Sequence, residues 1–111
     1  MNKEQFDANV KSIEEWGVVN IEPCPSENYP FACDLEMYTD CGGDMNISLD
    51  CLDKESLQDY IDGFDLNEEV INWWPNGCKG AGVPYDNIKE HYEDLEEWLE
   101  KLQSICNDMP Y

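Results

Sequence analysis

The stretch that decides the fold covers residues 31–51 and reads FACDLEMYTDCGGDMNISLDC. Its two halves alternate hydrophobic and polar residues with a period of two, which is typical of strands that bury one side. The hydrophobic positions are Phe31, Cys33, Leu35, Met37, Met45, Ile47, Leu49 and Cys51. The turn at residues 40–44 contains two adjacent glycines and predicts an antiparallel hairpin with one buried and one solvent-facing side.

The segments before the hairpin predict a helix and a third strand. Hydrophobic side chains recur at helical spacing over residues 3–16, and Gly17 predicts the end of that helix. Residues 18–21 are short and mostly β-branched, which favours a strand. Prolines between residues 23 and 30 predict an extended loop that leads into the hairpin.

Two short helices are predicted after the hairpin. Asp53 is placed to cap the first helix, and Asp65 with Glu68 has the spacing of a capping box at the start of the second. A glycine-rich connector follows at residues 78–83, and Pro84 is predicted to begin the last helix.

The last helix is expected to cover about residues 85–107. Its hydrophobic positions step by three and four residues through Tyr85, Ile88, Tyr92, Leu95, Leu99, Leu102 and Cys106, and Trp98, Ile105 and Met109 widen this seam. This heptad seam is compatible with a coiled-coil homodimer, but three heptads are near the minimum for one, so packing across the sheet and the first helix is favoured. The chain is therefore predicted to be one α+β domain, with an N-terminal helix, a three-stranded antiparallel sheet, two short helices and a long C-terminal helix.

The charge is strongly acidic. The chain has 26 Asp and Glu residues against six lysines and no arginine, and its formal net charge is −20. This balance argues against direct binding to nucleic acid or to an anionic membrane, because both need cationic side chains. No apolar run is long enough to span a membrane and no signal peptide is visible, so a monomer or homodimer in the cytoplasm is expected.

The cysteines and acids do not predict a dedicated metal site. The six cysteines include no C-x-x-C pair, and without an export signal free thiols that fill core space are expected, Cys33 and Cys51 among them. The acids of residues 62–68 do not follow the ligand order of an EF-hand. No metal or cofactor is predicted, although a divalent-metal-binding protein stays as an alternative.

Nothing in the sequence predicts an enzyme. His91 is the only histidine, is expected at the surface or boundary of its helix, and has no candidate nucleophile beside it. The glycines near residue 80 do not follow a strand and do not precede a P-loop lysine. The three tryptophans of the C-terminal half, Trp73, Trp74 and Trp98, are expected in the core rather than at an interface.

Clustering of the acids points to a basic partner. No lysine occurs between Lys11 and Lys54, a span that holds ten acids, and such clustering increases self-repulsion in the folded state. Acids three or four residues apart on one helix face lie about 5–6 Å apart, close to the phosphate spacing of a nucleic-acid strand. The predicted partner-binding residues are Asp34, Glu36, Asp40, Asp44, Asp50, Asp53, Asp59, Asp62, Glu90, Glu93, Glu97 and Glu100.

Two resemblances extend this interpretation. The acidic charge and the order of the predicted elements resemble the small anti-CRISPR and antirestriction proteins of phages and mobile elements. Several members of that group mimic DNA and block the nucleic-acid site of a nuclease. Residues 64–73, 82–84 and 94–99 also resemble small proteins common in phages and conjugative elements, which implies a mobile-element origin and supplies no catalytic residues.

The expected function is that of a non-enzymatic nucleic-acid mimic. Its partner would be a basic DNA- or RNA-handling protein, such as a host defence nuclease, that the acidic chain inhibits. An immunity protein that neutralises a basic toxin is the alternative within the same binding class.

Overall fold

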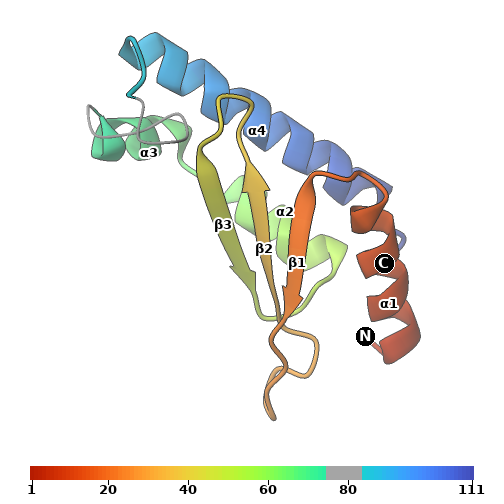
Figure 1. The fold of residues 1–111 in the computed structure, drawn as a ribbon. Helices are drawn as coiled ribbons and strands as arrows, with labels where there is room; N and C mark the ends of the chain where they lie inside the picture. The colour runs from red at the N-terminus through yellow and green to blue at the C-terminus, as the bar shows by residue number, and fades with distance from the viewer. Residues whose placement is uncertain (75–83) are drawn as a thin grey trace.

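Four helices and a three-stranded antiparallel sheet make up the computed structural model, which describes residues 1–74 and 84–111 (Figure 1). The elements are α1 (Lys3–Glu14), β1 (Val19–Pro23), β2 (Cys33–Tyr38), β3 (Asp44–Leu49), α2 (Lys54–Asp62), α3 (Leu66–Trp73) and α4 (Ile88–Asp108). The predicted α+β fold, with its N-terminal helix and long C-terminal helix, is confirmed. The predicted connector at residues 78–83 lies outside the described residues.

The sheet has the order β1-β2-β3, and its central strand carries the predicted alternation. In β2, Cys33, Leu35 and Met37 are buried, whereas Asp34 and Tyr38 are exposed. The hairpin closes where the Thr39 amide donates to the Gly43 carbonyl at 2.8 Å, with Gly42 at a φ of 96°. Only a residue without a side chain adopts that backbone readily, which explains a glycine in this turn.

The strands are shorter than the alternation predicts. Phe31 precedes β2, and Cys51 lies in a bend after β3, where it is half-buried rather than fully inside. The backbone leaves the ladder after Leu49 because the chain turns toward α2. The expected burial of Cys33 is confirmed, and that of Cys51 is only partial.

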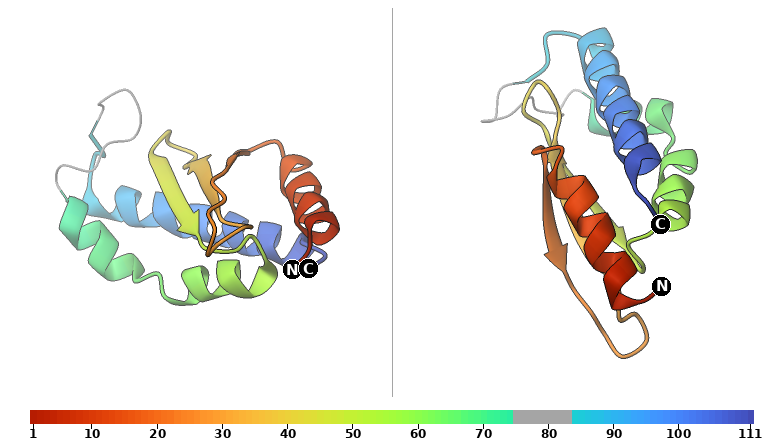
Figure 2. Two further views of the ribbon diagram at one scale, coloured as in Figure 1. Left: turned by 90° about the horizontal axis from the view of Figure 1, so that it is seen from below. Right: turned by 90° about the vertical axis from the view of Figure 1, so that its right-hand side faces the viewer.

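All the helices that cover the sheet lie on one of its faces, as the two views of Figure 2 show. α2 and α4 pack against this face, and α1 runs beside β1 near the C-terminal end of α4. Trp98 on α4 is 2% exposed, and its indole N–H donates to the Met37 carbonyl of β2 at 3.0 Å. The opposite face of the sheet stays open.

Polar side chains set the helix starts. Asp53 accepts a hydrogen bond from the Ser56 amide at 2.7 Å, so the predicted cap of α2 is confirmed. The predicted cap of α3 is confirmed as well, since Asp65 accepts from the Glu68 amide at 3.0 Å. The predicted start of the last helix at Pro84 is wrong, because Asn87 takes the capping position and α4 begins at Ile88.

The buried face of α4 contains most of the predicted seam, including Trp98, Ile105 and Met109. Its buried residues are His91, Asp94, Leu95, Trp98, Leu102, Ile105 and Cys106. Ile88 is 46% exposed, and Tyr92 and Leu99 are half-buried. Ile88, Tyr92 and Leu99 are less buried than the seam predicts, because α4 packs with one side against the sheet and against α1, α2 and α3, and Trp98 lies on that side. The inner seam positions thus pack into the core of the same chain.

Two further expectations are wrong. Trp73 is 56% exposed, and Trp74 is half-buried, because α3 is a short helix at one end of the molecule that, among the described elements, packs chiefly against α4. His91 is buried, at 4% exposure, instead of lying at the surface. Among the described residues, no helix is both long enough and apolar enough to cross a membrane.

Candidate functional site

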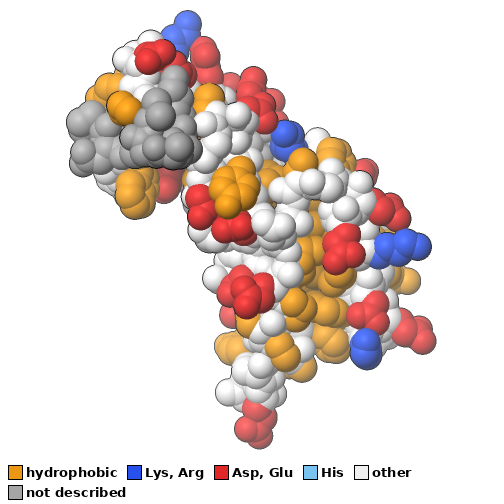
Figure 3. Space-filling view, viewed as in Figure 1, with side chains coloured by type: hydrophobic (Ala, Val, Ile, Leu, Met, Phe, Trp, Pro, Cys, Tyr) orange, Lys and Arg blue, Asp and Glu red, His pale blue; other side chains and the backbone are white. Residues whose placement is uncertain are grey.

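The open face of the sheet carries the first group of predicted partner-binding residues. Asp34 is exposed and Glu36 is half-buried on β2. Glu22 on β1 lies directly opposite Asp34, although it was not among the predicted site residues. Like charges directly opposite each other on neighbouring strands destabilise a sheet, so the pair of Glu22 and Asp34 lowers the stability of the fold. In Figure 3, the acidic side chains on this side of the molecule form several separate groups.

A shallow groove of about 440 Å³ runs along this open face. Its polar wall is formed by side chains from all three strands: Asn20, Glu22, Asp34, Glu36, Asn46 and Ser48. The Asn20 amide donates to the Glu36 carboxylate at 3.0 Å, which holds one carboxylate in place. None of the described residues along this groove is a lysine, so the groove presents acceptors and negative charge to whatever contacts it.

The hairpin turn and α4 bring further predicted residues together. Asp40 in the turn lies beside the Glu97 carboxyl group of α4, and its proximity raises the pKa of Glu97. Lys101 lies 3.1 Å from Asp40, and its hydrogen bond is the main reason that the pKa of Asp40 is lowered. The turn acid and the helix acid therefore form one negative cluster, beside which Lys101 is the one lysine among the described residues.

Asp44 connects this turn to the open face. Asp44 is exposed, and partial desolvation, followed by the negative charge of the nearby Glu36, raises its pKa. We define the hairpin carboxylates as six acids from the open face, the hairpin turn and the adjacent part of α4: Glu22, Asp34, Glu36, Asp40, Asp44 and Glu97. They form three like-charge pairs across neighbouring strands or elements: Glu22 with Asp34, Glu36 with Asp44, and Asp40 with Glu97.

The remaining acids of the long helix do not form a uniform row. Glu100 and Glu93 are exposed, but Glu93 forms an ion pair with Lys89 at 3.7 Å. Glu90 is half-buried near the start of α4, where its amide donates to the Asn87 cap. Of the four α4 acids predicted to bind a partner, Glu97 is thus the one that lies beside the hairpin turn.

Four predicted residues lie apart from the hairpin carboxylates. Asp53 caps α2; although burial opposes it, hydrogen bonds from Ser56 lower the pKa of Asp53, as expected for a carboxylate at a helix N-terminus. Asp62 accepts from the Gln58 amide at 2.9 Å. Asp50 is exposed after β3, and Asp59 is exposed on α2. These residues contribute to the overall charge rather than to one surface.

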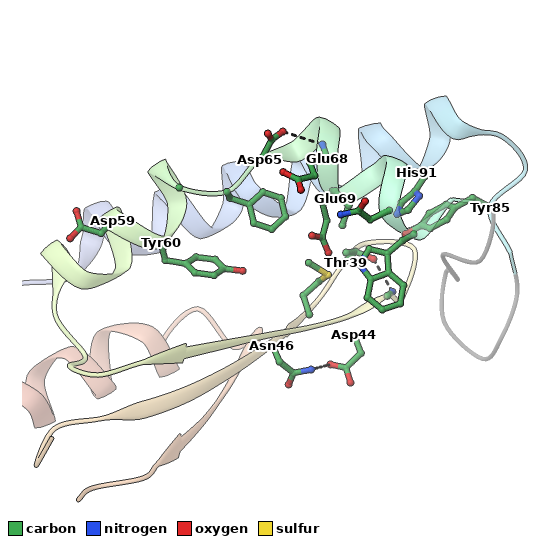
Figure 4. Close-up of a pocket in the computed structure, with 17 residues that line it drawn as sticks. Thr39, Asp44, Asn46, Asp59, Tyr60, Asp65, Glu68, Glu69, Tyr85 and His91 are labelled. Atoms are coloured by element: carbon green, nitrogen blue, oxygen red, sulfur yellow. Dashed lines mark hydrogen bonds between the residues drawn. The ribbon is translucent and has the colours of Figure 1, made fainter. Parts of the chain in front are cut away.

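A separate cavity of about 890 Å³ lies between the hairpin, α3 and the first turns of α4 (Figure 4). Aromatic rings, among them Tyr60, Phe64 and Trp73, line it together with carboxylates. Figure 4 shows Glu69 extending from α3 toward Thr39 of the hairpin, between Tyr60 on one side and His91 on the other. The sequence did not predict this cavity.

The buried carboxylate of Asp94 accepts a hydrogen bond from Tyr85, one of the residues that line this cavity. Asp94 is 4% exposed, accepts from the Tyr85 hydroxyl at 2.5 Å, and accepts from the Cys41 amide at 3.1 Å. Burial and the Asp94 carboxylate raise the pKa of Tyr85, so its hydroxyl stays protonated and donates. This network connects the hairpin turn to α4 without a lysine.

His91 is a neighbour of Tyr85 among the residues that line the cavity. Its ring stacks on Tyr85, with centroids 4.3 Å apart and planes 12° apart. Its Nδ1 is buried and has no hydrogen-bond partner among the described residues. Burial lowers the pKa of His91, and the charges of Asp94 and Glu69 oppose this only in part, so the ring is neutral near pH 7. The spacing of His91, Asp94 and Trp98, which places all three on one helix face, is the sequence signal that could have predicted the burial of His91 and Asp94.

The thiols and the metal-binding side chains define no further centre. In residues 1–74 and 84–111, no group of three His, Cys, Asp or Glu side chains is placed to hold a metal ion. Cys33 and Cys106 are buried, and burial raises the pKa of Cys33 to about 11. These thiols are therefore protonated and pack as small hydrophobic groups.

Comparison of the chain with models of protein families, with curated protein sequences and with solved structures found no match. The resemblance to small acidic phage proteins therefore stays a prediction.

Proposed function

We propose that this protein is a non-enzymatic acidic binding protein that occupies the nucleic-acid site of a basic, DNA- or RNA-handling protein and so inhibits it. The hairpin carboxylates are the proposed contact surface. The negative charge of the whole chain, −20, would speed the encounter with a cationic partner.

One observation carries this proposal: the three like-charge pairs among the hairpin carboxylates. In the protein alone each pair is unfavourable, since two carboxylates lie close together with little neutralisation. Against a cationic surface the same pairs become favourable, because each pair offers two acceptors to one lysine or arginine. Lys101 partly neutralises only one pair, through Asp40.

The geometry of the open face supports the same interpretation. Successive outward residues of one strand lie about 6.6 Å apart, as two residues of strand rise require, and this is close to the phosphate spacing of a nucleic-acid strand. Asp34 and Glu36 have this relationship on β2. None of the described helices covers this face, so a cationic partner has access to it.

The experiment compares two variants of equal charge. The hairpin variant carries Asp34→Asn, Glu36→Gln, Asp40→Asn and Asp44→Asn. The control variant removes four exposed acids elsewhere through Glu14→Gln, Glu15→Gln, Glu55→Gln and Glu96→Gln. Each protein is immobilised and used to capture proteins from a bacterial lysate at low and high salt, with mass spectrometry of the eluates.

We expect the wild type and the control variant to retain the same nucleic-acid-binding protein, and the hairpin variant to lose it. A duplex DNA or RNA competitor should displace the retained protein. Equal retention by both variants would contradict the assignment of the surface. Retention of one toxin that nucleic acid does not displace would favour an immunity protein instead.

A further inference from the structure

The strand β3 forms one outer edge of the sheet, and half of its backbone groups point away from β2. In an antiparallel pair, residues that bond to the neighbouring strand alternate with residues that face the other way. The Thr39 amide donates to the Gly43 carbonyl, which makes these two residues a bonded pair. Counting from that pair, the N–H and C=O groups of Asp44, Asn46 and Ser48 face outward. No backbone hydrogen bond joins these groups to another described residue.

The two edges of the sheet differ. At the other edge, β1 contacts α1 and ends in Pro23, which has no N–H to donate. Prolines, lysines and covering elements are the usual means by which proteins prevent an edge strand from pairing with another chain. The sequence of β3, DMNISL, contains neither proline nor lysine. The edge of β3 therefore presents a row of donors and acceptors to an extended chain.

The cavity between the hairpin, α3 and α4 lies beside the first half of this edge. Asp44, Met45 and Asn46 of β3 line it together with the rings of Tyr60 and Phe64. Figure 4 shows the Tyr60 side chain between α2 and β3. Because successive side chains of a strand point to opposite faces, a strand added to β3 places every second side chain on the side of this cavity. Its volume of about 890 Å³ leaves room for them.

The charge of the cavity determines which kind of chain fits. None of its described lining residues is a lysine, and five are acids: Asp44, Asp59, Asp65, Glu68 and Glu69. A second copy of this protein carries the same net charge of −20 and is repelled. An extended segment with lysine or arginine side chains is attracted instead, and it gains charge-assisted hydrogen bonds from the carboxylates.

We propose that the edge of β3 binds an extended, basic segment of a protein partner as a fourth strand of the sheet. The outward backbone groups of Asp44, Asn46 and Ser48 supply the hydrogen bonds of the added ladder, and the cavity takes alternate side chains of the segment. The proposed function is not needed for this inference, because the backbone edge and the cavity carry it. Of the hairpin carboxylates, only Asp44 borders the cavity.

The test uses a fluorescent peptide of alternating lysine and valine, titrated with the full chain. Two matched peptides are N-methylated, one at its valines and the other at its lysines. All three have the same charge and side chains, but each methylated peptide has lost the donors of one of its edges. We expect saturable binding of the parent, and one methylated peptide should bind at least about tenfold weaker than the other, as loss of two or three hydrogen bonds requires.

Amide hydrogen exchange measured by NMR locates the peptide. The amides of Asn46 and Ser48 should exchange fast in the free protein and become protected when the parent peptide is bound. The Ile21 amide is the control, because the same alternation directs it outward at the opposite edge, on β1. Its exchange should stay unchanged.

Two variants at one position connect binding to the edge. Asn46→Pro removes an outward N–H without removing a bond to β2, and it should weaken binding of the parent peptide at least about fivefold. Asn46→Ala keeps the N–H and should change binding less than about twofold. The methylated peptides and hydrogen exchange use the wild type, so they decide the question even where the proline variant fails to fold.

Three results would each overturn the proposal. Equal binding of the three peptides would show that charge alone attracts them. Unchanged exchange at Asn46 on saturation would place the peptide elsewhere. Protection of Asn46 that rises with protein concentration in the absence of peptide would show that a second copy of the chain occupies the edge.

Discussion

Asp40 in the hairpin turn and Glu97 on α4 bring their carboxyl groups close together, and the proximity of Asp40 raises the pKa of Glu97. Two acids thus lie side by side where the hairpin contacts α4. A salt bridge between an acid and a lysine would stabilise this contact more. Lys101 compensates Asp40 alone, at 3.1 Å. The structure therefore keeps negative charge at a contact where stability would favour neutrality, and the proposed function gives that charge a use.

The first prediction concerns this pair. Glu97→Gln supplies an amide that donates to Asp40 without adding charge, so the variant should melt about 1–3 °C higher than the wild type at pH 7, as a small stability gain in a domain of this size implies. Glu96→Gln is the control, because Glu96 is exposed on the same helix. A lower melting temperature for Glu97→Gln than for Glu96→Gln would show that the pair is not repulsive.

The same pair predicts a pH dependence. Because the folded pKa of Glu97 is raised, the folded state holds its proton to higher pH than the unfolded state does. The wild type should therefore lose stability as pH rises through the range just above the usual glutamate value, and Glu97→Gln should lose less. Urea unfolding of both proteins between pH 4.5 and 7 gives the comparison, with about 4.3 as the unperturbed reference.

His91 predicts the opposite slope at higher pH. Its folded pKa is lowered by burial, so only the unfolded chain takes up a proton as pH falls below about 6.5. Stability should fall with decreasing pH in that window, by at most about 1.4 kcal/mol per pH unit, the limit for one proton. His91→Phe should remove this slope between pH 7.5 and 6. An unchanged slope in the variant would show that another group titrates there.

The tryptophans predict unequal costs. Trp98→Phe removes a buried hydrogen bond to Met37 and leaves space in the core, so it should reduce the free energy of unfolding by about 2–4 kcal/mol. Trp73→Phe alters a side chain that is 56% exposed and should change the free energy by less than about 0.5 kcal/mol. Urea denaturation measures both, and similar losses would contradict the assigned packing.

The thiols predict an order of labelling. Cys24 is exposed and should react with a maleimide first, whereas Cys33 is fully buried with a pKa raised to about 11 and should react only after unfolding. Mass spectrometry of peptides after short labelling times reads each site. Rapid labelling of Cys33 in native buffer would show that the register of β2 is wrong.

Several features of the fold that depend on local sequence were predicted correctly. Alternation over residues 31–51 predicted which side of β2 is buried, and Asp53 and Asp65 predicted two helix caps. These features depend on neighbours along the chain. The burial of His91 and the exposure of Trp73 depend on how α3 and α4 meet, which no local pattern encodes.

The candidate site was predictable only in part. The acids of the hairpin follow from strand alternation, so Asp34 and Glu36 were correctly placed on the open face. The contact of Asp40 with Glu97 joins positions far apart in the sequence. Asp53 was included for its charge, although its position before a helix already indicated a cap. The cavity forms where the hairpin, α3 and α4 meet, so the number and spacing of acidic residues along the sequence could not predict it.

The most direct measurement of the central claim is a competition across a salt series. A labelled DNA or RNA duplex is bound to the basic protein recovered with the wild type, and each variant is titrated as the competitor. The account predicts that the wild type and the control variant displace the duplex with an affinity that falls as salt rises, because both ligands use the same cationic site. The Asp34→Asn, Glu36→Gln, Asp40→Asn, Asp44→Asn variant should displace it poorly at every salt concentration. Equal displacement by the hairpin and control variants would contradict the claim that the hairpin carboxylates mimic phosphates.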